Sequence, residues 1–435
     1  MILRGGLLAS LDPPRVDRAD LRVDRGRIVE RGPSLPSIPG EPELDVTSKL
    51  ILPGLVNAHT HLYSAMARGM PAPSAPPRSF VEVLERVWWR LDRALDEESI
   101  YLSGLLGAME AARSGTTVLV DHHSSPSFIQ GSLGLLRRAI EDVGLRSVLC
   151  YEVTDRNGPA GRDQGLDENA AFVADATGDL TRGLVGAHAS FTLGEESLAR
   201  IGALAHAPGS GVHIHVAEDR CDVEDCLARY GETLPQRLAR HGLRGPRALW
   251  AHCVHLAAGE PAEVAAAGGW IAHNPRSNMN NAVGYAGLGL TGRVALGTDG
   301  IDQDVLAEMR AAFLKMREGN RADAYGAALA LLAGGHRLAA ALFGLPFGAL
   351  APGGPADLVV CDYDPPTELH ADNLAGHLLF GLDRSHVSSV LVAGRFVLRD
   401  RRLANVDERQ VHERVRRAAR ALWQRMELLP SKEGW

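Results

Sequence analysis

Leu50-Ile-Leu-Pro-Gly-Leu-Val-Asn-Ala-His59-Thr-His61 joins a short apolar run to two histidines one residue apart. Side chains of a β-strand alternate between its faces, so His59 and His61 would project to the same side, about 7 Å apart along the chain. Two imidazoles on one face, at the end of a buried strand, can bind one metal ion. The alternative is that two polar residues simply follow a core strand, and this pair alone does not decide between the two interpretations.

The bulk composition bounds the class of protein. The 435 residues suffice for one large α/β domain and a smaller one. A formal net charge of −7 leaves no basic footprint for nucleic acid. The five scattered cysteines form no Cys-x-x-Cys pair and fit a reduced protein, and the first residues lack the apolar core of a signal peptide. Residues 327–343 contain Gly, His and Arg, which makes them a poor membrane span. We therefore expect a cytoplasmic protein without nucleic-acid or membrane partners.

The middle of the chain, residues 53–349, alternates strand-like with helix-like segments. After the opening strand, strand-like segments lie at residues 117–121, 146–150, 183–187, 212–216, 248–252, 270–273 and 294–298. Helical patterns lie between them, as at residues 97–114, 131–143, 195–206 and 262–267. Eight strands alternating with helices predict an α/β fold, most simply a closed (β/α)₈ barrel of the TIM type. An open doubly wound sheet is the alternative, and the lack of a GxGxxG motif after the first strand weakens it.

The two ends of the chain resemble each other in their short β-like runs and frequent turns. Neither end can hold a core alone, so we expect residues 1–52 and 350–405 to form one composite β-sandwich domain. The barrel, residues 53–349, would then be inserted between them. Residues 406–435 should form a C-terminal helix that packs on the barrel, because Val411, Val415, Ala418 and Leu422 make one apolar stripe.

Titratable side chains gather at the expected strand ends, where the catalytic groups of such barrels lie. Every expected strand but the third ends in at least one of them: His59 and His61; Asp121, His122 and His123; His188; His213, His215 and Glu218; His252 and His255; His273; Asp299. A single terminal histidine is usually structural, whereas this set predicts a shared site. Strand alternation lets only one of His122 and His123 point inward, without saying which.

Four motifs resemble those of the amidohydrolase superfamily, specifically its chlorohydrolase and aminohydrolase branch: Pro53-Gly-Leu-Val-Asn-Ala-His59-Thr-His61, His215-Val-Ala-Glu218, Ala251-His252-Cys-Val-His255 and Gly297-Thr-Asp299-Gly. Residues 84–98 and 274–285 are similar, more narrowly, to SsnA-type aminohydrolases and, more distantly, to 8-oxoguanine deaminases. The resemblance covers essentially the whole chain. It is far more specific for the superfamily than for a substrate.

The resemblance implies a metal bound by four ligands, His59, His61, His215 and Asp299. It also implies that Glu218 shuttles protons and that His252 hydrogen-bonds the attacking water or the developing oxyanion. Three imidazoles and one carboxylate suit Zn²⁺ first and Fe²⁺ as the alternative. Such a metal lowers the pKa of water toward neutrality. Asp299 could accept the water's proton, and Glu218 could protonate a ring nitrogen and then the departing amine.

The lysines bear on the number of metal ions. Binuclear members of this superfamily typically bridge their metals with a carboxylated lysine on the fourth strand. The lysines of this chain are Lys49, Lys315 and Lys432, and none lies at that strand. We therefore expect one divalent metal per chain. A bridging Cys or Glu is the less favoured alternative, and Cys150 would lie near the third strand.

Substrate contacts are predicted at His188, Trp88, Ser277 and Asn278. His188 follows the fourth strand, and Trp88 could stack on a flat heterocycle, although tryptophans at helical spacing are more often core residues. His213 lies deeper in the barrel and fits a structural hydrogen bond, whereas His255 fits a loop. Cys253 faces away from His252, because adjacent strand residues point to opposite sides, so no nucleophilic dyad is expected.

The sequence thus predicts a metal-dependent aminohydrolase that acts on a carbon–nitrogen bond of a cyclic amidine. Its metal-activated hydroxide would release ammonia from a purine-like or other N-heterocyclic base. One alternative is hydrolysis of another substituent, such as a halide, or hydrolytic opening of a ring amide. A non-catalytic binding barrel is a further alternative, which the complete set of ligands and proton carriers disfavours. The resemblance also implies a homodimer, while the heterocycle and the native metal stay open.

Overall fold

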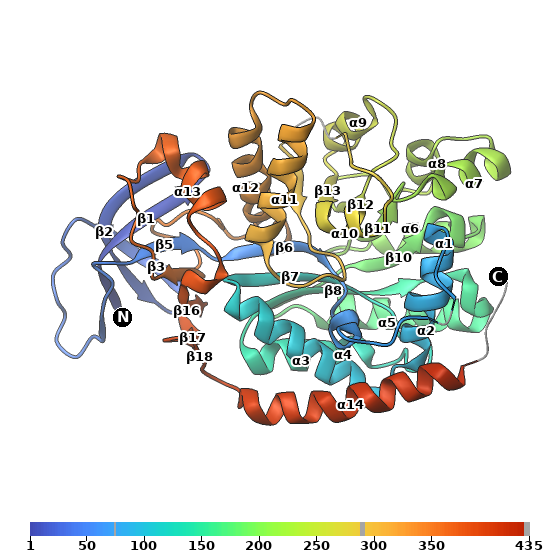
Figure 1. Cartoon of the computed structure of the whole chain (residues 1–435), viewed down its shortest axis with the longest axis horizontal. Helices are drawn as coiled ribbons and strands as arrows, with labels where there is room; N and C mark the ends of the chain where they lie inside the picture. The colour runs from blue at the N-terminus through green and yellow to red at the C-terminus, as the bar shows by residue number, and fades with distance from the viewer. Residues whose placement is uncertain (74, 288–291, 430–435) are drawn as a thin grey trace.

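The computed structural model describes residues 1–73, 75–287 and 292–429. Eight parallel strands run through the middle of the molecule (Figure 1). They are β6 (Leu55–Thr60), β7 (Thr116–His123), β8 (Arg146–Val153), β10 (Val185–Ala189), β11 (Val212–Val216), β12 (Ala248–His252), β13 (Trp270–His273) and β14 (Val294–Leu296). Each pairs with the next in parallel, and a short β9 (Thr181–Gly183) adds to β8. The predicted α/β barrel is therefore confirmed.

The barrel closes where the chain after β14 meets β6. The backbone N–H groups of Thr298 and Asp299 both donate to the carbonyl of His59, at 2.9 Å each. The Asn57 amide reinforces this seam, because it donates to Thr298 Oγ1 at 2.7 Å and accepts from Thr298 N at 3.0 Å. Gly297 permits the close approach, since a Cβ there would lie 2.8 Å from that of His59. The closure holds Asp299 beside the two histidines of β6.

Helices cover the outside of the barrel (Figure 1). They are α3 (Glu97–Arg113), α4 (Ser132–Val143), α5 (Gly158–Asp175), α6 (Glu195–Ala205), α7 (Arg220–Tyr230), α8 (Leu234–Arg240), α9 (Glu260–Ala266), α11 (Val305–Glu318) and α12 (Ala324–Phe343). The short α10 (Pro275–Asn280) follows β13 and lies at the barrel mouth. In α4, Leu136, Ala139, Ile140 and Val143 are buried at helical spacing, and Gly144 ends the helix at a φ of 102°. Among the described helices, α12 alone is long and apolar enough to cross a membrane. However, 67% of its apolar window is buried inside the fold, as in a core helix.

The two chain ends meet in a second sheet, as the predicted fold class requires. Its strands are β1 (Ile2–Leu11), β2 (Pro14–Asp24), β3 (Arg27–Gly32), β4 (Glu43–Asp45), β5 (Leu50–Pro53), β15 (Leu358–Cys361), β16 (Val387–Val392), β17 (Arg395–Arg399) and β18 (Arg402–Leu403). β5 joins the halves, because it pairs with β1 on one side and with β15 on the other. Across the described ranges these strands form one continuous, curved sheet rather than two separately bonded ones. The exact domain boundaries stay a prediction.

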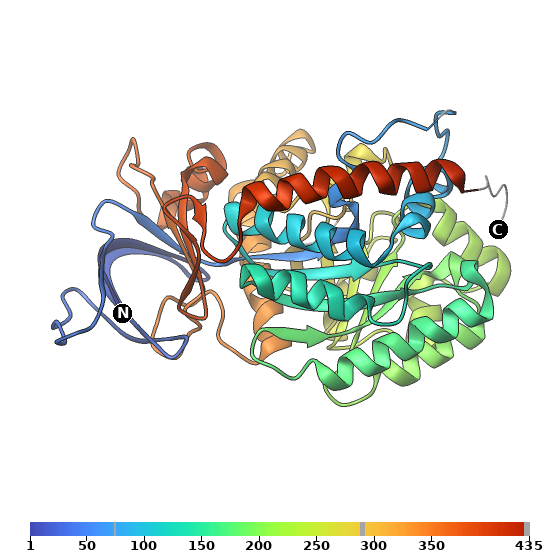
Figure 2. The same cartoon turned by 90° about the horizontal axis from the view of Figure 1, so that it is seen from below.

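The long helix α14 (Glu408–Leu428) crosses the outside of the barrel beside α3 (Figure 2). It buries the predicted apolar stripe Val411, Val415, Ala418 and Leu422. Trp423 Nε1 donates to the Met66 carbonyl at 3.1 Å, and Met66 lies in η1 (Leu62–Ala67), directly after the two histidines of β6. Three short helical segments, α1 (Phe80–Val83), the π-helical η2 (Leu84–Trp88) and α2 (Trp89–Ala94), complete the rim above the barrel mouth.

Candidate metal centre and active site

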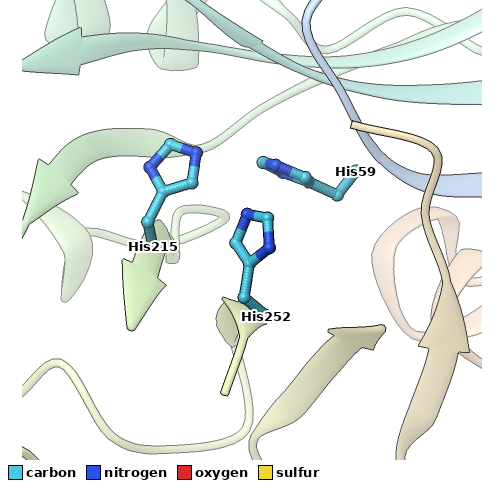
Figure 3. Close-up of side chains that lie close together, drawn as sticks. All are labelled: His59, His215 and His252. Atoms are coloured by element: carbon cyan, nitrogen blue, oxygen red, sulfur yellow. The ribbon is translucent and has the colours of Figure 1, made fainter. Parts of the chain in front are cut away.

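The carboxyl ends of three strands bring four of the predicted side chains together. His59 and His61 come from β6, His215 comes from β11, and Asp299 follows β14. His61 Nε2 lies 3.1 Å from both His215 Nε2 and Asp299 Oδ1, and His59 Nε2 lies 3.5 Å from Asp299 Oδ1. Figure 3 shows that the rings of His59 and His215 also converge with that of His252. The structure thus gathers the predicted ligand set into one cluster.

The Nδ1 atoms of His61 and His215 already make hydrogen bonds to backbone carbonyls. His61 Nδ1 donates to the His122 carbonyl at 2.6 Å, and His215 Nδ1 donates to the His188 carbonyl at 2.8 Å. A neutral imidazole carries a single ring hydrogen, so both Nε2 atoms then hold lone pairs. Two lone pairs that face each other at 3.1 Å repel unless a cation or a proton lies between them. The donor set therefore fits a divalent metal ion, and the carbonyls orient the rings toward it.

His59 is oriented by another histidine. Its Nδ1 lies 2.8 Å from His213 Nε2, whereas its fully buried Nε2 lacks a hydrogen-bond partner among the described residues. The other nitrogen of His213 lies 3.7 Å from Cys150 Sγ, which in turn donates to the Asp121 carbonyl at 3.5 Å. Burial lowers the pKa of His59 to about 3, which keeps this imidazole neutral. The deep hydrogen-bonding position predicted for His213 is thus the one observed, and Cys150 contacts His213.

Glu218 and His252 lie on the same side of the cluster. Glu218 follows β11, and His252 ends β12 with a φ of 71°, a left-handed conformation that non-glycine residues seldom adopt. Glu218 Oε2 lies 3.5 Å from His252 Nε2, and Asn281 donates to Glu218 Oε1 at 3.3 Å. Asn278 Oδ1 lies 2.8 Å from His252 Nδ1. Burial raises the pKa of Glu218 to about 7, so this carboxyl can hold a proton near neutral pH.

A cavity opens above the cluster. It is lined by His61, Tyr63, Ser64, Phe80, Leu84, Trp88, Trp89, Glu152, His188, His215, Glu218, Ser277, Asn280, Asn281, Asp299, Gly300 and Ile301. Of the predicted substrate contacts, His188, Trp88 and Ser277 therefore line it. Asn278 is not one of these lining residues, and we correct its assignment: it binds the ring of His252 from behind, because its side chain points toward β12.

The structure also decides between the two histidines at the end of β7. The His122 ring centre lies 4.6 Å from that of His215, so His122 faces the cluster. His123 faces away, and its Nε2 lies 2.9 Å from Ser125 Oγ. His255 donates from Nε2 to a loop carbonyl at 2.8 Å, as its predicted loop position requires.

One cavity residue was missed by the sequence patterns. β8 extends to Val153, whereas the prediction ended this strand at Cys150 and left it without a terminal titratable group. Glu152 points to the same face of the strand as Cys150, two residues earlier. Extending the predicted strand by two residues would therefore have placed Glu152 at its inward-facing end. Its Oε2 lies 3.5 Å from His122 Nδ1, and its Oε1 lies 3.4 Å from Arg156 Nη2. The third strand therefore does contribute a carboxylate to the mouth.

The sequence profile of the amidohydrolase family matches residues 50–397. A 5-methylthioadenosine/S-adenosylhomocysteine deaminase from Desulforudis audaxviator is 33% identical over 425 residues, which cover 93% of this chain and 94% of that protein. A 5'-deoxyadenosine deaminase from Methanothermobacter thermautotrophicus is 30% identical over 423 residues, which cover 95% of this chain and 96% of that protein.

Solved structures show the same fold. An adenosine deaminase from Xanthomonas campestris with bound zinc aligns with a TM-score of 0.83 at 23% identity, covering 98% of each chain. An atrazine chlorohydrolase from Arthrobacter aurescens complexed with zinc aligns with a TM-score of 0.82 at 22% identity, covering 97% of this chain and 99% of that one. At these identities the likeness concerns the fold alone.

Proposed function

Because this chain belongs to the amidohydrolase family, we propose that it is a metal-dependent hydrolase that releases ammonia from a purine-like or other N-heterocyclic base. The deaminases of adenosine-like compounds that match nearly the whole chain support this reaction type. The observation that carries the proposal is the convergence of imidazole lone pairs and one carboxylate at the barrel mouth. The narrower similarity to SsnA-type aminohydrolases stays a prediction from the sequence.

The proposed ligands of the metal are His59, His61, His215 and Asp299. Imidazole nitrogens and a carboxylate oxygen are typical zinc ligands, and zinc is bound in the two solved structures named above. Zinc is therefore the first candidate and iron the second. When bound, the metal would lower the pKa of water and so supply a nucleophile near neutral pH.

We propose one metal ion per chain, because no described lysine is near the mouth. Lys49 pairs with Asp362, and Lys315 pairs with Glu318, so neither can serve as a carboxylated bridge. Lys432 lies outside the described residues. A cytoplasmic location and a homodimer also remain predictions.

The chain's own groups would move the protons. The Ser277 hydroxyl donates to Asp299 Oδ2 and orients this carboxylate, which would accept the proton of the attacking water. Glu218 would carry a proton to a ring nitrogen of the substrate and then to the leaving amine. His252 Nδ1 lies 2.8 Å from Asn278 Oδ1 and 3.3 Å from Asn274 Nδ2, and with a hydrogen on Nε2 the ring would donate to the oxygen on which negative charge develops.

The cavity suits a flat heterocycle. Phe80, Leu84, Trp88 and Trp89 give it an apolar, largely aromatic side, whereas the proton carriers lie on the side of β11 and β12. Aromatic faces stack on planar rings and exclude water, which strengthens hydrogen bonds made within the cavity. A ring seated against this side would present its edge to Glu218.

Two measurements test the proposal. Metal analysis of protein purified without chelators should give close to one transition metal per chain, and a value close to two would contradict the mononuclear site. An ammonia-coupled assay over aminopurines, their nucleosides, oxopurines, aminopyrimidines and triazines should find a substrate whose turnover stops on chelation and returns with zinc. Release of halide without ammonia from a chlorinated triazine, with no deamination in the panel, would contradict the deaminase and favour the alternative leaving group.

A further inference from the structure

Glu152 lies in the cavity, but the proposed reaction does not use it. Its side chain is 4% exposed and lines the cavity together with His188. One oxygen of Glu152 and one ring nitrogen of His188 lie within 4.8 Å of each other. Both residues stand at the ends of β8 and β10, whereas Glu218 and His252 stand at the ends of β11 and β12. Glu152 and His188 thus form a second polar wall of the cavity, beside the wall formed by Glu218 and His252.

His188 presents a hydrogen-bond acceptor to this wall. Its Nδ1 lies 2.7 Å from Thr192 Oγ1, and the Thr192 hydroxyl donates to the Ala189 carbonyl at 3.1 Å. Because that hydroxyl hydrogen is used, Thr192 Oγ1 accepts the hydrogen of His188 Nδ1. The neutral ring then keeps a lone pair at Nε2.

Glu152 also keeps accepting capacity, because its neighbouring cation is shared. The Arg156 side chain is 4% exposed, contacts Asp92 closely, and lies 3.1 Å from Ser124 Oγ. Its guanidinium carbon lies 5.0 Å from the centre of the Trp89 ring. The contact of Arg156 with Glu152 is longer, at 3.4 Å. Arg156 thus contacts the carboxylates of both Asp92 and Glu152, and of these two Glu152 is the one that lines the cavity.

A second metal ion is a poor occupant for this wall. A divalent cation bound by Glu152 would stand beside the buried guanidinium of Arg156, where charges of the same sign repel strongly because the local dielectric constant is low. A neutral group that donates hydrogen bonds meets no such repulsion. It would satisfy both Glu152 and His188, which otherwise face the cavity as acceptors.

We propose that Glu152 determines substrate specificity: with His188 it accepts hydrogen bonds from two adjacent O–H or N–H donors that the substrate carries away from its reacting carbon. Such donors occur as the vicinal hydroxyls of a ribonucleoside or as the N–H edge of a purine base. The inference rests on the proposed function, which makes this cavity the substrate site. The charge of the wall also disfavours phosphorylated substrates.

Calorimetric titration with three deamination products measures binding at the wall of Glu152 and His188 without catalytic turnover. Inosine, 2',3'-dideoxyinosine and hypoxanthine would be titrated into the zinc-loaded wild type and Glu152→Gln. If the donors are sugar hydroxyls, the wild type binds inosine about 10- to 100-fold more tightly than dideoxyinosine, and Glu152→Gln abolishes this preference. If the donors are on the base, Glu152→Gln weakens all three ligands by a similar factor. Unchanged binding of all three in the variant, or no binding of any to the wild type, overturns the proposal.

Two further variants and a metal assay keep the test specific. Glu85→Gln makes the same change on the neighbouring η2, at a residue that does not line the cavity, and should leave binding unchanged. Glu152→Asp keeps the charge beside Arg156 but withdraws the carboxylate, so it should reproduce the loss even if Glu152→Gln folds poorly. Zinc content should be equal in all these proteins, and a loss of metal in Glu152→Gln would make Glu152 a ligand and overturn the proposal.

The ammonia assay separates the two proposals. If the wild type binds the probes through Glu152 but releases ammonia from no substrate, the proposed function is wrong and the donor-binding wall stands. If it releases ammonia and Glu152→Gln changes the kcat/KM of adenosine, 2',3'-dideoxyadenosine and adenine no more than Glu85→Gln does, the wall is wrong and the proposed function stands.

Discussion

The two ends of β8 bury charged side chains equally well, but their surroundings differ. At the amino end, Arg146 is 2% exposed and forms an ion pair with Asp357, which directly precedes β15 of the second sheet. The two N–O distances are 2.7 and 3.0 Å. The remaining groups are also satisfied, because Arg146 donates to the Asp179 carbonyl and Asp357 accepts from the Ala393 backbone. Each guanidinium nitrogen and each carboxylate oxygen of this pair has a hydrogen-bond partner, as expected for a contact that joins two parts of a fold.

The barrel mouth beyond the carboxyl end of the same strand differs, because buried ring nitrogens of neighbouring strands lack such partners there. The Nε2 atoms of His59 and His252 have no hydrogen bond to any described residue. An unpartnered buried polar atom costs about 1 to 3 kcal/mol, and a ligand that binds several of them at one place would offset that cost. Burial of charge therefore does not by itself mark a functional site, whereas buried lone pairs that face one another do.

The largest effect should follow removal of a proposed metal ligand. His61→Ala or His215→Ala should lower turnover of an active substrate by at least about 10³-fold, because the activated water is lost with the metal. Metal analysis should show that the ion is lost with activity. His255→Ala, outside the cluster, serves as the control and should retain the metal. Full metal content in both ligand variants would contradict the assigned set.

Glu218→Gln should have the next largest effect. We expect kcat to fall by about 10²- to 10⁴-fold while metal content stays at the wild-type level, because the amide cannot shuttle the proton. Stopped assays of ammonia release, with metal analysis on the same sample, check this. Turnover at the wild-type rate would rule out the proton-carrying role.

A substitution at the amino end of β8 should lower the stability of the fold and leave turnover unchanged, the reverse of the two preceding predictions. Arg146→Ala leaves Asp357 buried and unpaired, so the free energy of unfolding should fall by about 3 to 5 kcal/mol. Urea denaturation measures this, and kcat per folded molecule should be unchanged. Arg409→Ala, which breaks the exposed pair with Glu413, is the matched control and should cost less than about 1 kcal/mol. A lower kcat in folded Arg146→Ala would show that the ion pair at the amino end of β8 is not purely structural.

The smallest effect concerns a histidine that orients a ligand. His213→Ala removes the partner of His59 Nδ1, so zinc affinity should fall by about 10- to 100-fold. Competition with a chromophoric chelator measures the affinity, and His213→Gln, whose amide oxygen can still accept, should recover part of it. Equal affinities in wild type and His213→Ala would show that the hydrogen bond does not position the ring.

Much of the site could be predicted from local patterns, and the failures have local causes. The ligand set and Glu218 stand in short motifs, where spacing and residue type are visible in the sequence. Glu152 was missed because the predicted strand ended at Cys150, whereas β8 continues through Tyr151 and Glu152 to Val153. Asn278 was misassigned because a turn rich in asparagine does not show which amide points inward.

The sequence by itself determined the order of strands and helices and the position of the polar residues after them, because alternation and apolar periodicity act over a few neighbouring residues. Only the tertiary structure decided which atoms meet. Barrel closure brings Asp299 to Thr60, 239 residues earlier in the chain, and carbonyls of neighbouring strands determine which ring nitrogens keep lone pairs. Those contacts depend on strand register around the whole barrel, so the inward-facing lone pairs of the mouth are a property of the closed fold.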